Sequence, residues 1–393
     1  MSEKSAPLSK VQSYDIAVLG LGAMGAMAAW RGASRGAKVL GIEQFGIAHA
    51  RGSSHGGSRI FRKTLFEGPD YVPLIERADQ LWTQLGAESG KTVFQRSGGL
   101  CIGPRDGQLV QEALQCARFG GFEHQLLEPD ELAARYPQHA PFGDDVAVLE
   151  PGAGVLDPEE SIRAALGLAQ AAGADLRFET RVSALRTGGA GVEIIIGFGE
   201  ETVQARRAIV STGAWFTDLL PELELPLRVQ RSALIWFQGK DRAAYRPDRF
   251  PTFVRENAEM DGWGIPDVDG AGVKIGGGPS APKPWLDHAD DNDYPLNAKD
   301  TGPAEEFCRV AFPGLDPVSV AGRPCMNSKS PDGNFVVGIP EAAPSLVLAG
   351  GFSGHGFKHA SAIGEVTVDL ALDGDSGIPL ATFSPDRFSA GGD

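Results

Sequence analysis

Two stretches near the ends of this chain share one pattern of apolar and polar positions. Residues 16–19 form a short apolar run that leads into glycines, an alanine-rich helical pattern over 26–36 and a second apolar run over 39–42. Residues 345–349 form a similar run, followed by a glycine-rich turn over 350–356 and a helix with apolar residues on one face. Continuous apolar runs are typical of strands buried on both faces of a parallel sheet. The two matching junctions predict one α/β domain that is discontinuous in sequence.

The middle of the chain shows further patterns. Apolar residues from Leu74 to Leu85 recur at helical spacing, and Asp157-Pro158 supplies an N-cap acid and a first-turn proline for another helix. Loops rich in proline, glycine and aspartate surround apolar runs over 234–237 and 273–276, which favours a different, antiparallel sheet. Further strands are predicted over 97–102, 175–178, 192–196 and 208–213.

Composition narrows the class of protein. A chain of 393 residues is long enough for two domains, and a formal charge of −15 disfavours nucleic acid and anionic membrane surfaces as partners. The polar segment 1–13 has no apolar core and is expected to be a disordered leader, and no apolar stretch reaches the length of a membrane span. The four cysteines are far apart and predict neither a metal site nor disulfides, which indicates a cytoplasmic location.

A dinucleotide-binding fingerprint follows the first strand. Gly20, Gly22 and Gly25 have the G-x-G-x-x-G spacing, in which the glycines allow a tight turn, a close approach to pyrophosphate and close packing of helix on strand. Glu43 ends the second strand, where an acid accepts hydrogen bonds from ribose hydroxyls and repels the 2′-phosphate of NADP. The fingerprint alone does not separate FAD from NAD.

The predicted fold class is therefore α/β, with a Rossmann-like dinucleotide-binding domain and an α+β substrate domain built on an antiparallel sheet. The expected divisions are the leader over 1–13, the dinucleotide-binding domain over 14–95, 150–220 and 325–393, and the substrate or catalytic domain over 96–149 and 221–324.

Several motifs together resemble one family of enzymes. The segment 52–62 (GSSHGGSRIFR), Lys274 in G-V-K-I-G, Cys325-Met326 and the segment 350–358 (GGFSGHGFK) resemble monomeric sarcosine oxidase and N-methyltryptophan oxidase, within the D-amino-acid-oxidase-like flavoenzymes. The resemblance covers about residues 14–388 and implies FAD, attached covalently through the Cys325 sulfur to the flavin 8-methyl group. A buried, unreactive thiol is the alternative for Cys325. The implied cofactor-binding residues are Gly20, Gly22, Ala23, Met24, Gly25, Glu43, Gln44, Ser53, His55, Ser58, Arg59, Val182, Thr212, Gly213, Trp215, Cys325, Met326, Gly351, Phe352, Gly354, His355, Gly356, Phe357 and Lys358.

The resemblance also assigns four cations to catalysis. Arg62 and Lys358 match the pair that holds a substrate carboxylate, a task suited to an arginine fork and a lysine point charge. Lys274 matches a lysine that activates oxygen near the flavin, and Arg59 matches an arginine that contributes positive field there. The alternatives are surface cations for Arg62 and Lys358 and an outward lysine on an exposed sheet for Lys274. His55 and His355 are equally compatible with packing and with function.

The chain departs from the family in its substrate pocket. Trp263 and Gly278 stand where sarcosine oxidase has a tyrosine and a histidine, Asn327 replaces another tyrosine, and Gly57 stands where an aspartate is usual. We expect Trp263, Gly278 and Asn327 to line a pocket that is larger or reshaped, so that a bulky N-methyl or cyclic amino acid is preferred to sarcosine.

The implied function is FAD-dependent oxidation of a secondary α-amino acid or related amine, with hydride transfer to flavin, imine hydrolysis and reduction of O₂ to hydrogen peroxide. The partners are then a small amine and O₂, and the protein is expected to be a monomer. Two alternatives stay open: a flavin dehydrogenase or natural-product biosynthetic amine oxidase, and a catalytically decayed flavin-binding subunit with an assembly or regulatory role. Retention of Arg62, Lys274, Cys325 and Lys358 argues against decay.

Overall fold

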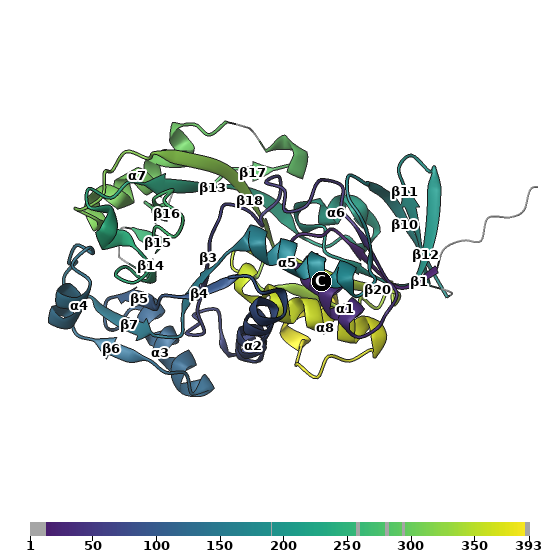
Figure 1. The fold of residues 1–393 in the computed structure, drawn as a ribbon, viewed down its shortest axis with the longest axis horizontal. Helices are drawn as coiled ribbons and strands as arrows, with labels where there is room; N and C mark the ends of the chain where they lie inside the picture. Colours follow the sequence, from purple (N-terminus) through teal and green to yellow (C-terminus); the bar gives the residue numbers. More distant parts are fainter. Residues whose placement is uncertain (1–12, 190, 257–259, 280–282, 293–294, 390–393) are drawn as a thin grey trace, which may run out of the picture.

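The computed structural model describes residues 13–189, 191–256, 260–279, 283–292 and 295–389. All but the last residue of the predicted leader therefore lies outside the described residues. The chain forms two large sheets at opposite ends of the molecule, with helices around them (Figure 1). Among the described residues, no helix combines the length and hydropathy needed to cross a bilayer.

The first sheet unites the two ends of the chain. The central strands are parallel, and β20 from the C-terminal part pairs with β12 through Ala208–Leu346, Ile209–Val347 and Val210–Leu348. The spatial order is β10 (Val182–Gly188), β11 (Gly191–Ile196), β12 (Glu201–Val210), β1 (Ser13–Leu19), β2 (Val39–Ile42) and β9 (Asp175–Arg177), with β20 (Leu346–Gly350) beside β12 and β19 (Val336–Gly338) beside β20. The predicted α/β class and the parallel strands at both ends of the chain are confirmed.

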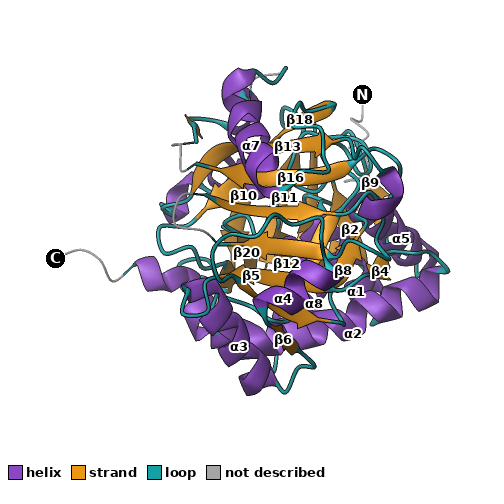
Figure 2. Cartoon of the chain, turned by 90° about the vertical axis from the view of Figure 1, so that its left-hand side faces the viewer, coloured by secondary structure: helices purple, strands orange, loops and turns teal. Residues whose placement is uncertain are grey.

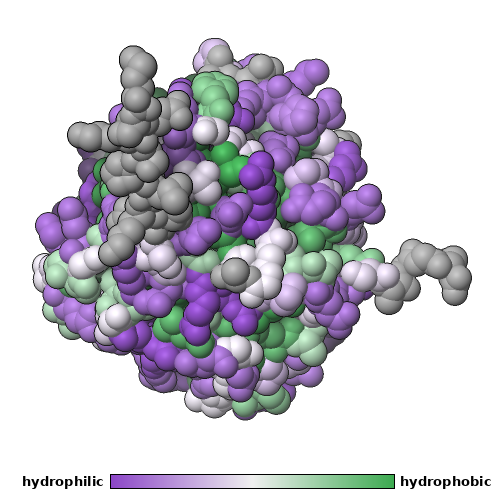
Figure 3. Space-filling model, turned by 90° about the vertical axis from the view of Figure 1, so that its right-hand side faces the viewer, coloured by the Kyte–Doolittle hydropathy of each residue, from purple (hydrophilic) through white to green (hydrophobic). Residues whose placement is uncertain are grey.

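Helices cover the first sheet. The helices α1 (Ala23–Ser34), α5 (Pro158–Ala171) and α8 (Ala360–Leu372) pack together, and α2 (Val72–Ser89) packs against α5 and α8. Asp157 caps α5 as predicted, because its carboxylate accepts the backbone N–H of Glu160 at 2.8 Å. The short helix α6 (Phe216–Leu219) follows β12. On the face at this end of the molecule, polar and apolar residues are interspersed (Figure 3).

The second sheet is antiparallel with one exception. Its order is β17 (Trp285–Leu286), β13 (Arg228–Phe237), β16 (Val273–Gly278), β15 (Asp261–Ile265), β14 (Thr252–Arg255), β5 (Gly99–Gly103), β7 (Val146–Glu150) and β6 (Gln125–Leu127), with β18 (Ala321–Lys329) also beside β13. The predicted antiparallel sheet of the substrate domain is confirmed, with one parallel pair, β14 and β5. Parallel neighbours need a long crossover, and here the chain passes through the first sheet between them.

Three more helices and a small sheet complete the fold. α7 (Ala298–Ala311) packs against β16 and β13 (Figure 2), and α3 (Gln108–Gly120) and α4 (Pro129–Arg135) pack near β5, β6 and β7. The small sheet has the order β3 (Arg59–Phe61), β8 (Gly154–Leu156) and β4 (Phe94–Arg96).

Strand β18 crosses the division expected between residues 324 and 325. It pairs with β13 over nine positions, from Arg228–Lys329 to Trp236–Ala321, so Cys325 lies in a strand of the second sheet. The sequence offered no sign of this ladder, because the 321–329 stretch is not continuously apolar. The second sheet therefore forms one wall of the space in front of the glycine-rich turns of the first sheet.

Candidate active site

A large cavity of about 1830 Å³ lies where the two sheets meet. Its walls come from the fingerprint turn, the 52–62 loop, strands β13, β15, β16 and β18, and the 351–358 turn. Pockets that hold drug-sized ligands are typically about 300–1,000 Å³. This cavity therefore has room for a dinucleotide and a second molecule beside it.

The fingerprint glycines form an open cradle at the start of α1. Gly20 has φ +85°, and a Cβ there would lie 2.8 Å from the Ser211 carbonyl oxygen, so only glycine fits the turn. Gly22 is the N-cap of α1 and has no side-chain cap, and a Cβ on it would meet only Ser54 Oγ, at 3.5 Å. The N-terminal end of α1 thus faces the cavity, as phosphate binding at a helix N-terminus requires, and its Ala23 N–H donates to Ser54 Oγ at 3.2 Å.

Glu43 is held rigidly at the rim of the cradle. The residue is buried, and its carboxylate accepts the backbone N–H groups of Leu21 at 2.8 Å and Phe45 at 3.0 Å. Each oxygen keeps further lone-pair capacity toward the cavity. At the same end, Thr212 Oγ1 is buried without a hydrogen-bond partner among the described residues, and Thr212 lines the cavity. An unpaired hydroxyl, an oriented carboxylate and a helix N-terminus that faces the cavity fit a dinucleotide such as FAD.

Most residues predicted to bind the cofactor line this one cavity. The exceptions are Gly25, His55 and Met326. Gly25 packs on the turn itself, since a Cβ there would lie 1.9 Å from the Gly20 carbonyl oxygen. Met326 lies on the opposite side of β18 from its neighbour Cys325, in a separate apolar cluster with Val229. His55 is 1 % exposed with both ring nitrogens unpaired among the described residues, and burial lowers its pKa to about 3.

Lys274 lies behind the cavity wall. Its Nζ donates to the Gly56 carbonyl at 2.5 Å, the Ser58 carbonyl at 2.9 Å and Ser58 Oγ at 2.6 Å, and the residue is 1 % exposed. Burial, followed by the nearby charge of Arg59, holds the pKa of Lys274 well below its usual range. The alternative of an outward lysine on an exposed sheet is wrong. The amine does not line the cavity, contrary to the expectation from strand alternation, because the turn at residues 56–58 covers it.

Two acids support that turn. Glu159 accepts the N–H of Gly56 at 2.6 Å and of Gly57 at 3.0 Å. Asp269 Oδ2 lies 3.2 Å from the position that a Gly57 Cβ would take. The Asp269 carboxylate therefore lies beside Gly57, the position at which an aspartate is usual in the family. Its charge raises the pKa of Lys274, which opposes the effect of burial.

Arg62 and Lys358 meet at a third side chain, Glu67. Lys358 Nζ donates to Glu67 Oε1 at 2.6 Å, and Arg62 donates through Nη2 to both carboxylate oxygens at 3.2 Å. All three side chains are buried and line the cavity. The alternative of surface cations is therefore wrong for Arg62 and Lys358. One acid against two cations leaves a net positive charge facing the cavity.

The electrostatics of this trio follow from burial and pairing. Arg62 and Lys358 together hold the pKa of Glu67 well below its usual range, although burial acts in the other direction. Burial lowers the pKa of Lys358 to about 8, with Glu67 opposing the shift. His355 hydrogen-bonds through Nε2 with the Gly333 carbonyl at 3.1 Å, and burial lowers its pKa to about 4. Lys358 is thus charged at neutral pH while His355 is neutral.

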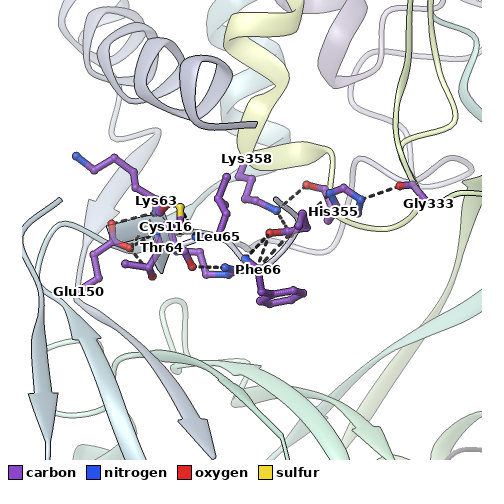
Figure 4. Close-up of polar contacts among 11 residues, drawn as sticks. Lys63, Thr64, Leu65, Phe66, Cys116, Glu150, Gly333, His355 and Lys358 are labelled. Carbon is purple, nitrogen blue, oxygen red and sulfur yellow. Dashed lines mark hydrogen bonds and ion pairs between the residues drawn. The ribbon is translucent and has the colours of Figure 1, made fainter. Parts of the chain in front are cut away.

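Glu67 was missed by the sequence analysis. Its only sequence signal is an acid five residues after Arg62, in a glycine-containing turn. A second acid, Glu150, sets the direction of the Arg62 segment by accepting the backbone N–H of Lys63 at 2.9 Å and of Thr64 at 2.8 Å (Figure 4). Neither acid follows a motif, and both act through contacts between distant parts of the chain.

Cys325 lies in the wall beside a cationic group. It is 4 % exposed, lines the cavity and packs with Leu234, Trp236 and Trp263. Arg59 interacts electrostatically with the Cys325 sulfur, and its guanidinium donates to the carbonyls of Ser58 at 2.8 Å and Ser53 at 2.7 Å. Hydrogen bonds to two carbonyls fix this positive charge near the thiol.

Trp263, Gly278 and Asn327, three of the four departures from the family pattern, line the cavity, but Gly278 does not enlarge it. Gly278 has φ +116°, and a Cβ there would lie 2.1 Å from the Pro303 carbonyl oxygen of α7. The expectation that the missing histidine leaves empty space at residue 278 was wrong, because the α7 backbone fills it. Trp263 packs flat against Gly276, and the Asn327 amide packs against Gly354.

Comparisons with known proteins agree on one family. The family model described as FAD dependent oxidoreductase matches residues 15–370. Monomeric sarcosine oxidase of Streptomyces avermitilis is 36% identical over 96% of this chain and 98% of its own length, and N-methyl-L-tryptophan oxidase of Escherichia coli strain K12 is 33% identical over 95% and 99%. Among solved structures, the open form of NikD, an unusual amino acid oxidase essential for nikkomycin biosynthesis, has a TM-score of 0.81 at 23% identity, covering 95% of this chain and 98% of that one. L-proline dehydrogenase from P. horikoshii has a TM-score of 0.83 at 21% identity, covering 96% and 98%.

Proposed function

This chain belongs to the family of FAD-dependent oxidoreductases, and we propose that it oxidises secondary α-amino acids, either N-methylated or cyclic, as an FAD-dependent oxidase. The observation that carries the proposal is the convergence of Arg62 and Lys358 on one carboxylate inside the cavity. Sarcosine oxidase and N-methyl-L-tryptophan oxidase, its relatives, are named for N-methyl amino acids of very different size. The family thus accommodates a broad range of side chains around one type of reacting group.

FAD would be held by the N-terminus of α1, by Glu43 at the rim of the cradle and by the residues around Thr212. When bound, FAD accepts a hydride from the carbon next to the amine nitrogen and passes the electrons to O₂, giving hydrogen peroxide and an imine that water hydrolyses. The protein contributes position and electric field.

Arg62 and Lys358 bind and orient the substrate carboxylate. Arginine supplies parallel N–H donors and lysine a point charge, so the two fix both the direction and the depth of an α-carboxylate. Because Glu67 already occupies these donors, an incoming carboxylate either displaces it or shares the cations with it. Fixing the carboxylate also fixes the neighbouring α-carbon, which is the orientation that such a reaction depends on.

For Cys325 we propose a covalent thioether to the flavin 8-methyl group. In support, the thiol lines the cavity wall, and hydrogen bonds to two backbone carbonyls hold the Arg59 guanidinium near it. For Lys274 we propose a role in oxygen reduction, as a positive charge held behind the turn at residues 56–58. Three acceptors hold the Lys274 Nζ in place, and in its protonated form it would stabilise negative charge that develops on the cavity side of the turn. We further propose that the protein acts as a monomer in the cytoplasm, with O₂ as its second substrate.

A panel of amines tests the function. Sarcosine, N-methyl-L-tryptophan, L-proline and their primary-amine counterparts are mixed with the holoenzyme without oxygen, and loss of the flavin absorbance is followed. Bleaching by secondary amino acids, then peroxide release when air is admitted, is the expected result. Bleaching without peroxide identifies a dehydrogenase, and no bleaching by any amine favours a decayed, non-catalytic subunit.

A further inference from the structure

Strands β13 and β16 are paired with each other over only part of their length. They pair only through Ile235–Ile275, Trp236–Lys274 and Phe237–Val273. Beyond that point, residues 276–278 of β16 pair with β15, while residues 229–230 of β13 pair with β17. Among the described residues, positions 232–234 of β13 have no partner strand on the β16 side. The second sheet therefore has an opening between these two strands.

The cavity passes through this opening. Leu234 and Cys325 pack on the face toward the cofactor cradle, whereas Ile235 packs with Ala304 of α7 on the other face, as alternate residues of a strand must. One continuous cavity is nonetheless lined by Leu234 and Cys325 and also by Pro303 and Ala304. Residues at the opening itself, including Ser232, Ala233 and Gly277, belong to the same lining.

The glycines of β16 keep the opening clear. Gly277 and Gly278 have φ values of +127° and +116°, and a Cβ on Gly277 would lie 2.3 Å from the Asp261 carbonyl oxygen. At Gly276 a Cβ would lie 2.5 Å from the Trp263 ring. Gly277 and Gly278 therefore carry no side chain into the opening, whereas the Trp263 ring packs against Gly276.

The walls of the opening change in character along its depth. Ala233, Ile235, Pro303 and Ala304 make its middle part apolar. At the far end, Arg231 donates to Asp300 at 3.0 and 3.1 Å, so these charges are already neutralised by each other. A chain of methylene or aryl groups matches the apolar middle part of the opening.

We propose that this opening receives the side chain of the substrate. The preferred substrate is then an α-amino acid with a secondary amine and an elongated apolar side chain, whose carboxylate is held by Arg62 and Lys358 and whose side chain runs between β13 and β16 toward α7. The inference rests on the proposed function and specifies the substrate class of that same site. The extra room lies in the opening, and not at residue 278, where α7 fills the space.

Side-chain length is the variable to test. N-methyl amino acids with straight side chains from one to six carbons are compared on the wild-type holoenzyme. Each buried methylene contributes about 0.8 kcal/mol, or about fourfold, so kcat/KM is expected to rise by at least tenfold along the series. A flat or falling series, with sarcosine oxidised best, would overturn the inference while leaving the proposed function intact.

A substitution at the opening gives the second arm. Ala233→Val narrows the passage and suits a strand, so it is expected to lower kcat/KM about tenfold for the six-carbon side chain and less than twofold for N-methylalanine. Ala321→Val, on the exposed first residue of β18, is the matched control and should change neither. Equal losses for both substrates in Ala233→Val would point to general damage and refute the passage.

A binding measurement separates this inference from the proposed function. Straight-chain carboxylic acids, which carry no amine to oxidise, are titrated into the holoenzyme by calorimetry. Affinity that increases with chain length in wild type, and less steeply in Ala233→Val, supports the passage even if no N-methyl amino acid is oxidised. Affinity independent of length in both proteins overturns it.

Discussion

Glu67 and Lys358 form a short buried ion pair, with 2.6 Å between the carboxylate oxygen Oε1 and the ammonium nitrogen. Glu67 also contacts Arg62 at 3.2 Å, so both cations assigned to a substrate carboxylate already share an internal one. The protein therefore carries a carboxylate of its own in the position that we propose for the carboxylate of the substrate.

Removing the charge of Glu67 should make the thermal stability of the protein depend on whether a carboxylate ligand is bound. Glu67→Gln leaves two buried cations without a counter-charge, which typically costs about 3–5 kcal/mol and should lower the melting temperature by several degrees. A saturating carboxylate such as N-methylalanine should restore more of this loss than it adds to wild type, because it supplies the missing anion. Thermal unfolding with and without ligand measures the effect. Asp79→Asn, which removes an acid paired with Lys63 and Arg96, is the control and should not be rescued.

Carboxylate binding should weaken above pH 8. Burial lowers the pKa of Lys358 to about 8, so its charged form is present below that value and is lost as pH rises through it. Binding of a simple carboxylic acid, which has no amine of its own to titrate, should then fall as pH goes from 7 to 9. Calorimetric dissociation constants across this range give the profile. Lys358→Gln should bind weakly with no inflection near pH 8, and an unchanged inflection in that variant would assign the titration to another group.

The colour of the denatured protein shows whether the flavin is covalently attached. Wild-type protein precipitated with acid should remain yellow, whereas Cys325→Ser should release its flavin into the supernatant, because the sulfur that lines the cavity is gone. Cys308→Ser serves as the control, since this buried thiol packs with Phe307 in a different cluster. Colour retained by Cys325→Ser, or lost by wild type, contradicts the proposed bond.

Replacing Lys274 should affect the two half-reactions differently. Lys274→Met removes a fixed charge of the kind that contributes about 3 kcal/mol to a developing oxyanion, so reoxidation by O₂ should slow by about a hundredfold. Reduction by substrate should change far less, because that step does not build charge on oxygen. Stopped-flow mixing separates the two rates. Lys299→Met, on the cavity wall near α7, is the control, and a selective oxygen defect there would weaken the assignment to Lys274.

Gly278 should tolerate no side chain. In Gly278→Ala the added Cβ would lie 2.1 Å from the Pro303 carbonyl oxygen at φ +116°, so both a clash and backbone strain oppose it. In Gly36→Ala the backbone is also strained, at φ +78°, but the added Cβ meets no atom within 4 Å. Comparing the two variants therefore isolates the effect of the clash. Urea unfolding should show a loss of about 1 kcal/mol for Gly36→Ala and clearly more for Gly278→Ala. Equal losses would mean that α7 moves aside easily.

Sequence patterns predicted the parts of the fold that depend on residues close together in the chain. The buried strands, the cap of α5 by Asp157 and the glycine cradle all follow from residues close in sequence. Glu67 and the α7 backbone beside Gly278 could not be predicted, because each acts on a partner brought near only by the tertiary fold. The position of Lys274 shows both sides of this limit. Strand alternation gave the face of the sheet, but the turn that covers its amine comes from more than 200 residues earlier, as the sequence separation of 218 for its bond to Gly56 shows.

The pairing of β20 with β12 affects when this protein can acquire its cofactor. One side of the first sheet stays incomplete during synthesis until residue 350 has left the ribosome, because β20 is a parallel partner of β12 and joins β19 to the sheet. The turn at residues 351–358 follows β20 directly, so the cavity also lacks that wall until then. Contacts this distant in sequence form slowly, and the partial sheet exposes apolar strand edges meanwhile. The cofactor can therefore bind only late in the folding of the chain. Truncation after residue 345 should abolish both flavin binding and solubility.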